Sequence, residues 1–280
     1  MINKTFTVTK KNITSLGILR IDYDYEPALG DIDHHGSYNY PVYYRVVPGL
    51  TFEVCQKGIW TDEIKTRLER AIEFLEEEKG VSAITADCGF MMWYQPYLRE
   101  MTRKPVFLSA LTQIPSVLSF FGSKKQIMIM TANGQSLEPM RQLIRDEAGV
   151  DTEKPQFVIV GCENTETFGP AVAQGLKVPV ENCIPEIVAV AKEALKKHKL
   201  VGAIVLECTE LPPYANSIRY ATGLPVYDSI TNANFGMAGV SKSRNFGINY
   251  MLSFDGRQES YGYGKNLSDE EKDELEFKKG

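Results

Sequence analysis

The sequence predicts an α/β protein of two similar lobes, each a mostly parallel sheet with helices on both faces. Apolar segments of strand length alternate with helical patterns along most of the chain, as in parallel sheets that are buried on both sides. Two such segments, one in each half, end in an acidic residue and then a cysteine, Cys88 and Cys208. We therefore expect the lobes to be related by a pseudo-two-fold axis, with a cleft between them.

The first lobe is expected over residues 1–122. A strand over 13–21 and another over 41–47 flank an irregular stretch rich in Tyr, Asp, His and Gly. The clearest helix spans 61–79, because its apolar residues recur on one face and Gly80 suits its C-terminal cap. The remaining elements are a strand that ends at Cys88, a helix over 91–101, a strand over 105–110 and a helix to about Phe121.

The second lobe is expected over residues 123–228 and repeats the alternation. Pro185 is placed at the start of one helix, where a first-turn proline is tolerated. A helix and return segment over 229–256 should pack on the lobes, and an acidic tail over 257–280 follows. The strands are predicted over 126–131, 156–161, 201–208 and 225–227, and the helices over 136–148, 186–198, 213–222 and 269–277.

The composition indicates a soluble globular protein, with 43% hydrophobic and 24% charged residues among 280. The net charge is −5 and no basic stripe occurs, which argues against nucleic acid and anionic membranes as partners. The first residues lack the apolar run of a signal peptide, and no later stretch is long enough to cross a bilayer. We expect a cytoplasmic protein.

The five cysteines are an odd number and form no C-x-x-C pair, which argues against a disulfide framework or a metal site. A free cysteine is usually a small buried apolar residue, and we interpret Cys55, Cys162 and Cys183 in that way. The sequence contains neither G-x-G-x-x-G nor G-x-S-x-G, so a nucleotide-dependent enzyme and a serine hydrolase are disfavoured.

Cys88 and Cys208 stand where a strand turns into a helix. In open α/β sheets ligands bind at the carboxyl ends of strands, and helix dipoles there lower the pKa of a thiol from about 8.5. A thiolate on one side of a carbon and a thiol on the other would invert that carbon without a cofactor. Glu210 would relay a proton and Thr209 would hold a substrate carboxylate, with helix capping as the alternative role for both.

Other polar residues near the strands are weaker candidates. Strand alternation predicts that Asp87 and Glu207 point away from the thiols and have structural roles. Arg45 is a candidate for substrate binding, and Arg20 and the Tyr-rich stretch over 23–44 could line a pocket for a second carboxylate or an aromatic group. A surface ion pair is the alternative for each arginine.

The chain resembles the aspartate/glutamate racemase superfamily over roughly residues 13–240. The resemblance lies in Ala86-Asp87-Cys88-Gly89, in Leu206-Glu207-Cys208-Thr209-Glu210-Leu211-Pro212, and in the strand end Thr131-Ala132-Asn133-Gly134. It implies a cofactor-independent enzyme with a pseudo-symmetric two-lobed fold, often a homodimer. The residues it implies are catalytic Cys88, Cys208 and Glu210, and substrate-binding Gly89, Phe90, Thr131, Asn133 and Thr209.

Three features depart from that pattern. Gly89-Phe90 follows the first cysteine where amino-acid racemases have Asn-Thr, so only backbone N–H groups remain there to bind a carboxylate. The first strand leads into an aromatic segment in place of a glycine-rich turn. Glu210 stands where glutamate racemases have His, which makes the second motif closer to the aspartate type.

We therefore expect a PLP-independent racemase or epimerase that inverts the α-carbon of an aspartate-like or glutamate-like amino acid or a close derivative. A maleate-type cis–trans isomerase and a hydantoin racemase are the enzymatic alternatives. A protein that binds small carboxylates and has lost its activity is the non-enzymatic alternative. The expected partners are a carboxylate-bearing small molecule and a second copy of the chain.

Overall fold

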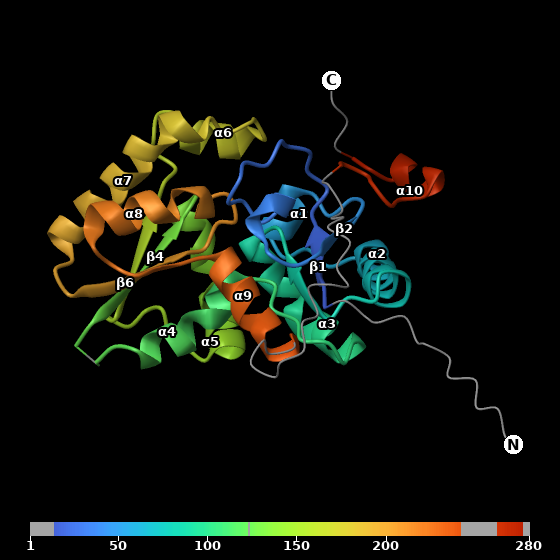
Figure 1. The fold of residues 1–280 in the computed structure, drawn as a ribbon, viewed down its shortest axis with the longest axis horizontal. Coiled ribbons are helices and arrows are strands. Elements are labelled where there is room, and N and C mark those ends of the chain that lie inside the picture. The colour runs from blue at the N-terminus through green and yellow to red at the C-terminus, as the bar shows by residue number, and fades with distance from the viewer. Residues whose placement is uncertain (1–13, 123, 242–261, 277–280) are drawn as a thin grey trace, which may run out of the picture.

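The computed structural model describes residues 14–122, 124–241 and 262–276, and confirms an α/β fold of two parallel-sheet lobes (Figure 1). In the first lobe the strand order is β2-β1-β3. All pairings in this sheet are parallel among the described strands. Its strands are β1 (Leu16–Arg20), β2 (Val42–Val46) and β3 (Ala83–Ala86).

The second lobe has the strand order β5-β4-β6-β7, again with parallel pairings between the described strands. The central strands β4 and β6 are continuous apolar runs and are almost entirely buried, as expected when helices cover both faces of a sheet. The strands are β4 (Gln126–Thr131), β5 (Phe157–Gly161), β6 (Val201–Leu206) and β7 (Val226–Tyr227).

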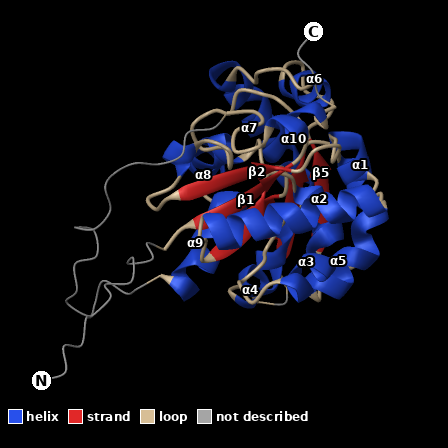
Figure 2. Cartoon of the chain, turned by 90° about the vertical axis from the view of Figure 1, so that its right-hand side faces the viewer, coloured by secondary structure: helices blue, strands red, loops and turns tan. Residues whose placement is uncertain are grey.

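Helices lie on both sides of the strands (Figure 2). Those of the first half are η1 (His35–Ser37), α1 (Phe52–Gln56), α2 (Asp62–Glu73), the π-helical turn η2 (Phe74–Glu78), η3 (Gly89–Tyr94), α3 (Gln95–Met101), η4 (Ala110–Gln113) and α4 (Ile114–Ser119). Those of the second half are η5 (Gly134–Met140), α5 (Arg141–Ala148), α6 (Phe168–Gln174), α7 (Val180–Lys197), η6 (Pro212–Tyr214), α8 (Ala215–Thr222), α9 (Ser229–Val240) and α10 (Asp269–Asp273).

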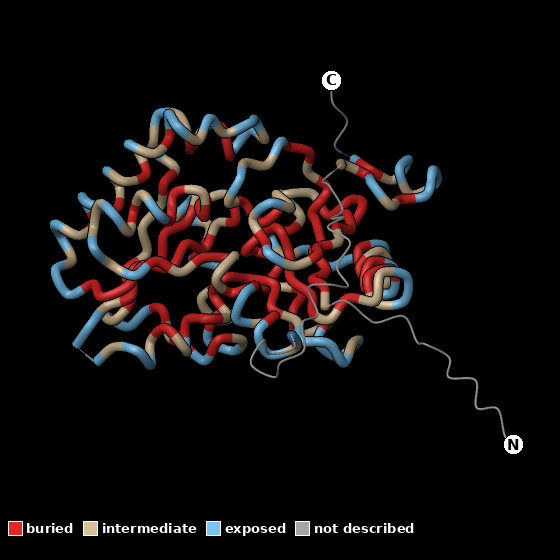
Figure 3. The backbone as a smooth tube through the Cα atoms, in the orientation of Figure 1, coloured by how far each residue is buried: buried red, intermediate tan, exposed pale blue. Residues whose placement is uncertain are grey.

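The largest buried cluster runs from one sheet to the other. It joins Leu19 and Ile84 of the first sheet to Ile127 and Val205 of the second, so the two lobes share apolar packing. The buried residues therefore lie along the middle of the molecule, between and around the two sheets (Figure 3). This shared core holds the carboxyl ends of β3 and β6 next to each other.

Some sequence predictions about the elements are wrong. Only Val106 of the expected strand over 105–110 bridges to another strand, because Ser109 then caps η4 and the chain turns into a helix. Pro185 lies inside α7, which begins at Val180. Helices α1 and α6 were not predicted at all, and most of the return segment after α9 lies outside the described residues.

Residues 262–276 of the acidic tail pack against the first lobe beside β2. Arg45 on β2 donates hydrogen bonds to the carbonyl of Asn266 and to the carboxylate of Glu271. Its guanidinium also lies 4.3 Å from the centre of the Phe74 ring, an attractive cation–π geometry. Arg45 is 5% exposed, so its charge is compensated almost entirely by these contacts.

We expect Arg45→Ala to lower the free energy of unfolding by about 1–3 kcal/mol, because the variant loses charge-assisted hydrogen bonds that are nearly buried. Hydrogen exchange should become faster at the amides of residues 263–276. Arg103→Ala removes an exposed arginine and serves as the control. Unchanged exchange in the tail of Arg45→Ala would show that Arg45 does not anchor it.

Candidate active site

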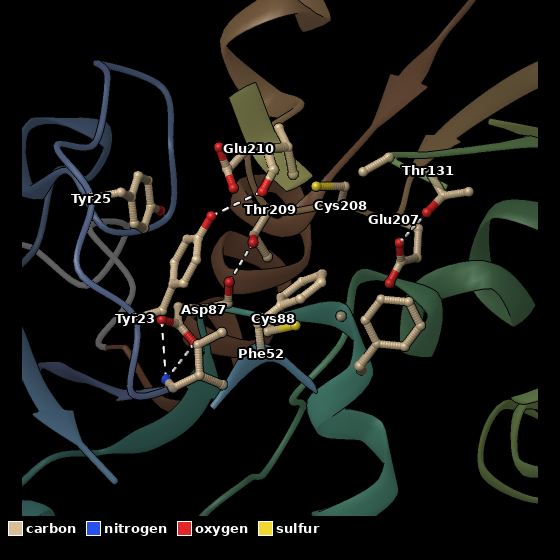
Figure 4. Close-up of a pocket in the computed structure, with 15 residues that line it drawn as sticks. Tyr23, Tyr25, Phe52, Asp87, Cys88, Thr131, Glu207, Cys208, Thr209 and Glu210 are labelled. Atoms are coloured by element: carbon tan, nitrogen blue, oxygen red, sulfur yellow. Dashed lines mark hydrogen bonds between the residues drawn. The ribbon is translucent and has the colours of Figure 1, made fainter. Parts of the chain in front are cut away.

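The structure brings Cys88 and Cys208 to opposite walls of one pocket, as Figure 4 shows for their sulfur atoms. Cys88 follows β3 after Asp87 and is the N-cap of η3, while Cys208 follows β6 after Glu207. The pocket lies where segments of both lobes meet, since its lining includes residues on either side of Cys88 and of Cys208. Each cysteine follows the carboxyl end of a strand in its own parallel sheet, and both strand ends border the pocket, so the cysteines meet although they lie in different halves of the chain.

Most of the predicted site residues line this pocket, and two do not. Arg45 is bound to the C-terminal tail, so its predicted contact with substrate is wrong. Asn133 caps η5 by accepting a hydrogen bond from the backbone of Gln135 and is likewise absent from the lining. The described lining consists of Ile21, Tyr23, Tyr25, Phe52, Asp87, Cys88, Gly89, Phe90, Thr131, Ala132, Val172, Glu207, Cys208, Thr209 and Glu210.

The two threonines of the pocket donate their hydroxyl protons within the protein. Thr209 donates to the backbone carbonyl of Asp87, which directly connects the two segments that carry the thiols. Thr131 donates to Oε2 of Glu207 at 2.7 Å. Each hydroxyl has one proton, so neither side chain can also donate to a substrate carboxylate without giving up this bond.

Glu207 lines the pocket, contrary to the prediction that it points away from it. Strand β6 ends one residue earlier, at Leu206, so strand alternation does not govern the direction of this side chain. Its Oε1 atom is buried and has no hydrogen-bond partner among the described residues. A Cβ atom placed on Gly89 would lie 1.8 Å from that oxygen, which explains the glycine after Cys88.

Asp87 also borders the pocket, although it too was predicted to point away from the thiols. Both of its carboxylate oxygens accept from the backbone N–H of Ile21, at 3.0 and 3.2 Å. One of them lies 3.5 Å from Nε of Arg20, which in turn donates to Asp33 at 2.8 Å. Arg20 is therefore buried behind the pocket and does not line it.

The two glutamates of the pocket hold protons more tightly than ordinary carboxyl groups. Burial raises the pKa of Glu207 to about 7, against the opposing effect of the hydrogen bond from Thr131. Burial, reinforced by the negative charge of Asp33, raises the pKa of Glu210 to about 8. Glu210 is thus mostly neutral at pH 7, and either residue can exchange a proton near neutral pH.

The thiols are held protonated, whereas the sequence suggested that helix dipoles would lower their pKa values. A hydrogen bond with Cys55, followed by burial, raises the pKa of Cys88. Burial, followed by the charge of Glu210, raises the pKa of Cys208. Cys55 comes from α1, which the sequence did not predict, so this third thiol beside Cys88 could not be anticipated.

Aromatic rings form one wall of the pocket. Tyr23, from the segment after β1, donates from its hydroxyl to the carbonyl of Val172 in the second lobe at 2.9 Å. Phe52 begins α1, and Phe90 lies in the first turn of η3. Among the described residues that line the pocket, none is Lys, Arg or His. The wall is therefore apolar and electron-rich, without a cationic side chain.

The described residues contain neither a candidate metal cluster nor a candidate membrane-spanning helix. No group of His, Cys, Asp and Glu side chains there is arranged to hold a metal ion. No helix in the same part of the chain has both the length and the apolar character needed to span a bilayer.

The chain is similar in sequence to one group of proteins and similar in fold to another. No protein-family profile matches the chain. The chain is 52% identical over 259 residues to dimethylsulfoniopropionate lyase 7 of Emiliania huxleyi, covering 91% of this chain and 75% of that protein. It is 46% identical over 259 residues to a dimethylsulfoniopropionate lyase of Durusdinium sp. clade D, covering 92% of this chain and 86% of that protein.

Among solved structures, a glutamate racemase from Bacillus anthracis is similar, with a TM-score of 0.52 and 82% of each chain covered. Its sequence identity of 15% supports the fold alone. The relatives at 46–52% identity are lyases, so the assignment to the racemases and the predicted amino-acid racemase or isomerase activity are wrong. The cysteine motifs indicated the correct fold and an incorrect reaction.

We expect Gly89→Ala to lower the free energy of unfolding by about 1–3 kcal/mol, because the new methyl group collides with the buried carboxyl of Glu207. Gly239→Ala is a matched control, since nothing lies within 4 Å of a Cβ at that helical position. The free energy of unfolding of Gly239→Ala should be equal to or higher than that of the original protein. Thermal denaturation measures both, and equal melting temperatures for the two variants would contradict the close approach of Glu207.

Raising the pH from 5 to 8.5 should destabilise the protein. Glu207 and Glu210 keep their protons in the folded state up to about pH 7 and 8, whereas their ordinary pKa is 4.5. The unfolded chain therefore binds fewer protons, and the stability present at low pH is lost as the pH rises through the folded pKa values.

The test is the melting temperature as a function of pH. The melting temperature of Glu210→Gln should fall less steeply than that of the original protein between pH 5 and 8.5. Glu53→Gln, at an exposed position whose pKa is lowered by its hydrogen bond with Lys57, should keep the original slope. A Glu210→Gln variant with the original slope would mean that Glu210 is ionised when folded.

Proposed function

The chain belongs to the dimethylsulfoniopropionate lyase family, and we propose that it cleaves dimethylsulfoniopropionate by elimination. This molecule carries a positive dimethylsulfonium group at one end of a propionate and a carboxylate at the other. A base removes a proton from the carbon next to the carboxylate. The electron pair of that bond forms a carbon–carbon double bond, and the carbon–sulfur bond breaks with its electrons leaving on sulfur. The products are dimethyl sulfide and acrylate.

The observation that carries the proposal is the combination of groups in one pocket. Two thiols on opposite walls provide an acceptor for a proton on carbon. The described lining joins aromatic rings to the carboxyl groups of Asp87, Glu207 and Glu210, and no Lys, Arg or His side chain belongs to it. These features favour a substrate with a positive charge beside an acidic C–H bond.

We assign the role of base to Cys208. Phe52 and Phe90 pack in the same core cluster as Cys88, whereas Cys208 packs against the core of the second lobe. A sulfonium group on the aromatic side would lie near Cys88 and would turn the carbon next to the carboxylate toward Cys208. The sulfonium is only two bonds from the carbon that would face Cys208, so its positive charge lowers the pKa of both thiols and offsets the burial that keeps Cys208 protonated in the free protein.

Glu210, when ionised, would take the thiol proton of Cys208 and leave the thiolate that acts as base. The proton removed from the substrate then restores the Cys208 thiol, and Glu210 releases its proton to solvent. Glu210 lies two residues beyond the thiol in the same pocket, and its pKa of about 8 lets it accept and release a proton near neutral pH.

The relatives are named as lyases, which favours an enzyme over a binding protein without activity.

Proton NMR of dimethylsulfoniopropionate with the protein tests this function. The S-methyl signal of the substrate should decay while the vinyl signals of acrylate grow. Cys208→Ala should lower kcat/KM at least about 100-fold, a loss in the range expected when a general base is removed. Cys183→Ala, at a buried cysteine outside the pocket, should keep the original rate.

Two results would contradict the proposal. Absence of acrylate from a correctly folded protein would reject the lyase function. An original rate in Cys208→Ala together with a large loss in Cys88→Ala would keep the function and exchange the roles of the thiols.

A further inference from the structure

Three aromatic rings that the proton transfer does not use surround one part of the pocket. The centres of the Tyr23 and Phe52 rings are 6.0 Å apart, with 35° between their planes. The Phe52 and Phe90 rings are 6.4 Å apart and nearly perpendicular, at 88°. The three side chains come from the segment after β1, from α1 and from η3, and all of them line the pocket.

These rings are fixed in place before a ligand arrives. The hydroxyl of Tyr23 is tied to Val172 in the other lobe. Phe52 follows Thr51, whose side chain caps α1 by accepting from the N–H of Val54 at 3.3 Å. Phe90 is 6% exposed and belongs to the main core. A preformed set of rings binds without the entropic cost of ordering side chains.

Tyr25 also lines the pocket, but we do not count it with these three rings because it already contacts other side chains. Its ring already faces the guanidinium of Arg20 at 5.8 Å, and its hydroxyl donates to Asp31 at 2.9 Å. Arg20 is itself paired with Asp33, so it adds no uncompensated positive charge next to the rings. The three rings thus share the pocket with the carboxyl of Glu210, which lies near the hydroxyl end of Tyr23 (Figure 4).

We propose that Tyr23, Phe52 and Phe90 form an aromatic box that binds the dimethylsulfonium group and sets the preference for methylated onium substrates. The box rests on the proposed function for the identity of the substrate. A methylated onium spreads its charge over methyl groups that contact ring faces, the arrangement in which cation–π attraction is strong. A primary ammonium is more strongly hydrated, and ring faces do not replace the hydrogen bonds that its N–H groups lose.

The test compares ligands that share a carboxylate and differ in the other end. The onium probe is 3-(trimethylammonio)propionate, its neutral isostere is 4,4-dimethylpentanoate, and β-alanine supplies a primary ammonium. Isothermal titration calorimetry on the full-length protein should give a Kd for the onium probe about tenfold or more below that of the neutral isostere, and a weaker affinity still for β-alanine.

Substitutions then isolate the rings. Phe52→Leu and Phe90→Leu keep apolar volume and remove the ring faces, so each should reduce the ratio of the two affinities several-fold while the affinity for the neutral isostere stays similar. Phe120→Leu changes an exposed phenylalanine outside the pocket and should keep the original ratio. Equal affinities of the original protein for onium and isostere would overturn the box, whatever the variants do.

The two proposals can fail separately, because calorimetry does not depend on turnover. Onium preference that falls in Phe52→Leu and Phe90→Leu, without formation of acrylate, would support the box and reject the lyase function. Formation of acrylate with an unchanged affinity ratio in both folded variants would support the function and overturn the box. Circular dichroism of each variant establishes that it is folded before the ratios are compared.

Discussion

The hydrogen bond from the Thr209 hydroxyl to the Asp87 carbonyl holds this site together. Thr209 directly follows one thiol and Asp87 directly precedes the other, so the bond sets how far apart Cys208 and Cys88 can lie. A second link, from Tyr23 to Val172, also crosses between the lobes and closes the pocket on its aromatic side. Both links use backbone carbonyls, which do not change with sequence, and their donors are polar side chains that a sequence pattern assigns to the substrate.

A second feature of the structure is a group of buried carboxyl groups whose pKa values are raised. Burial raises the pKa values of Asp31, Asp33 and Asp87, and the guanidinium of Arg20 lies beside Asp33 and Asp87. Several buried carboxylates beside one cation are tolerated only when some of them remain protonated. Glu207 and Glu210 in the pocket are likewise buried and hold their protons. A positive ligand would allow these groups to ionise, because its charge would compensate theirs.

The sequence predicts those parts of the structure that depend on local pattern. Strand β4 has the predicted bounds because its apolar run is continuous, and the thiols meet because each follows the carboxyl end of a strand in its own parallel sheet. The direction of Glu207, the tail contact of Arg45 and the reach of Tyr23 to the second lobe depend on segments far apart in the chain, so no local pattern reports them. The reaction was mistaken for a similar reason. The motif around Cys208 points to proton transfer, whereas the rings that we propose bind the sulfonium group come from the segment after β1, from α1 and from η3.

The lack of a cationic side chain in the described lining also bears on how the reaction ends. In the proposed cleavage the substrate enters as a zwitterion, and its positive half departs as neutral dimethyl sulfide. The remaining acrylate is an anion among carboxyl groups, with neither a sulfonium nor a protein cation to balance it. Those carboxyl groups that ionised beside the sulfonium then repel the acrylate and favour its expulsion. The chemical step itself thus turns a well-matched ligand into a poorly matched one, which drives turnover forward and limits inhibition by product.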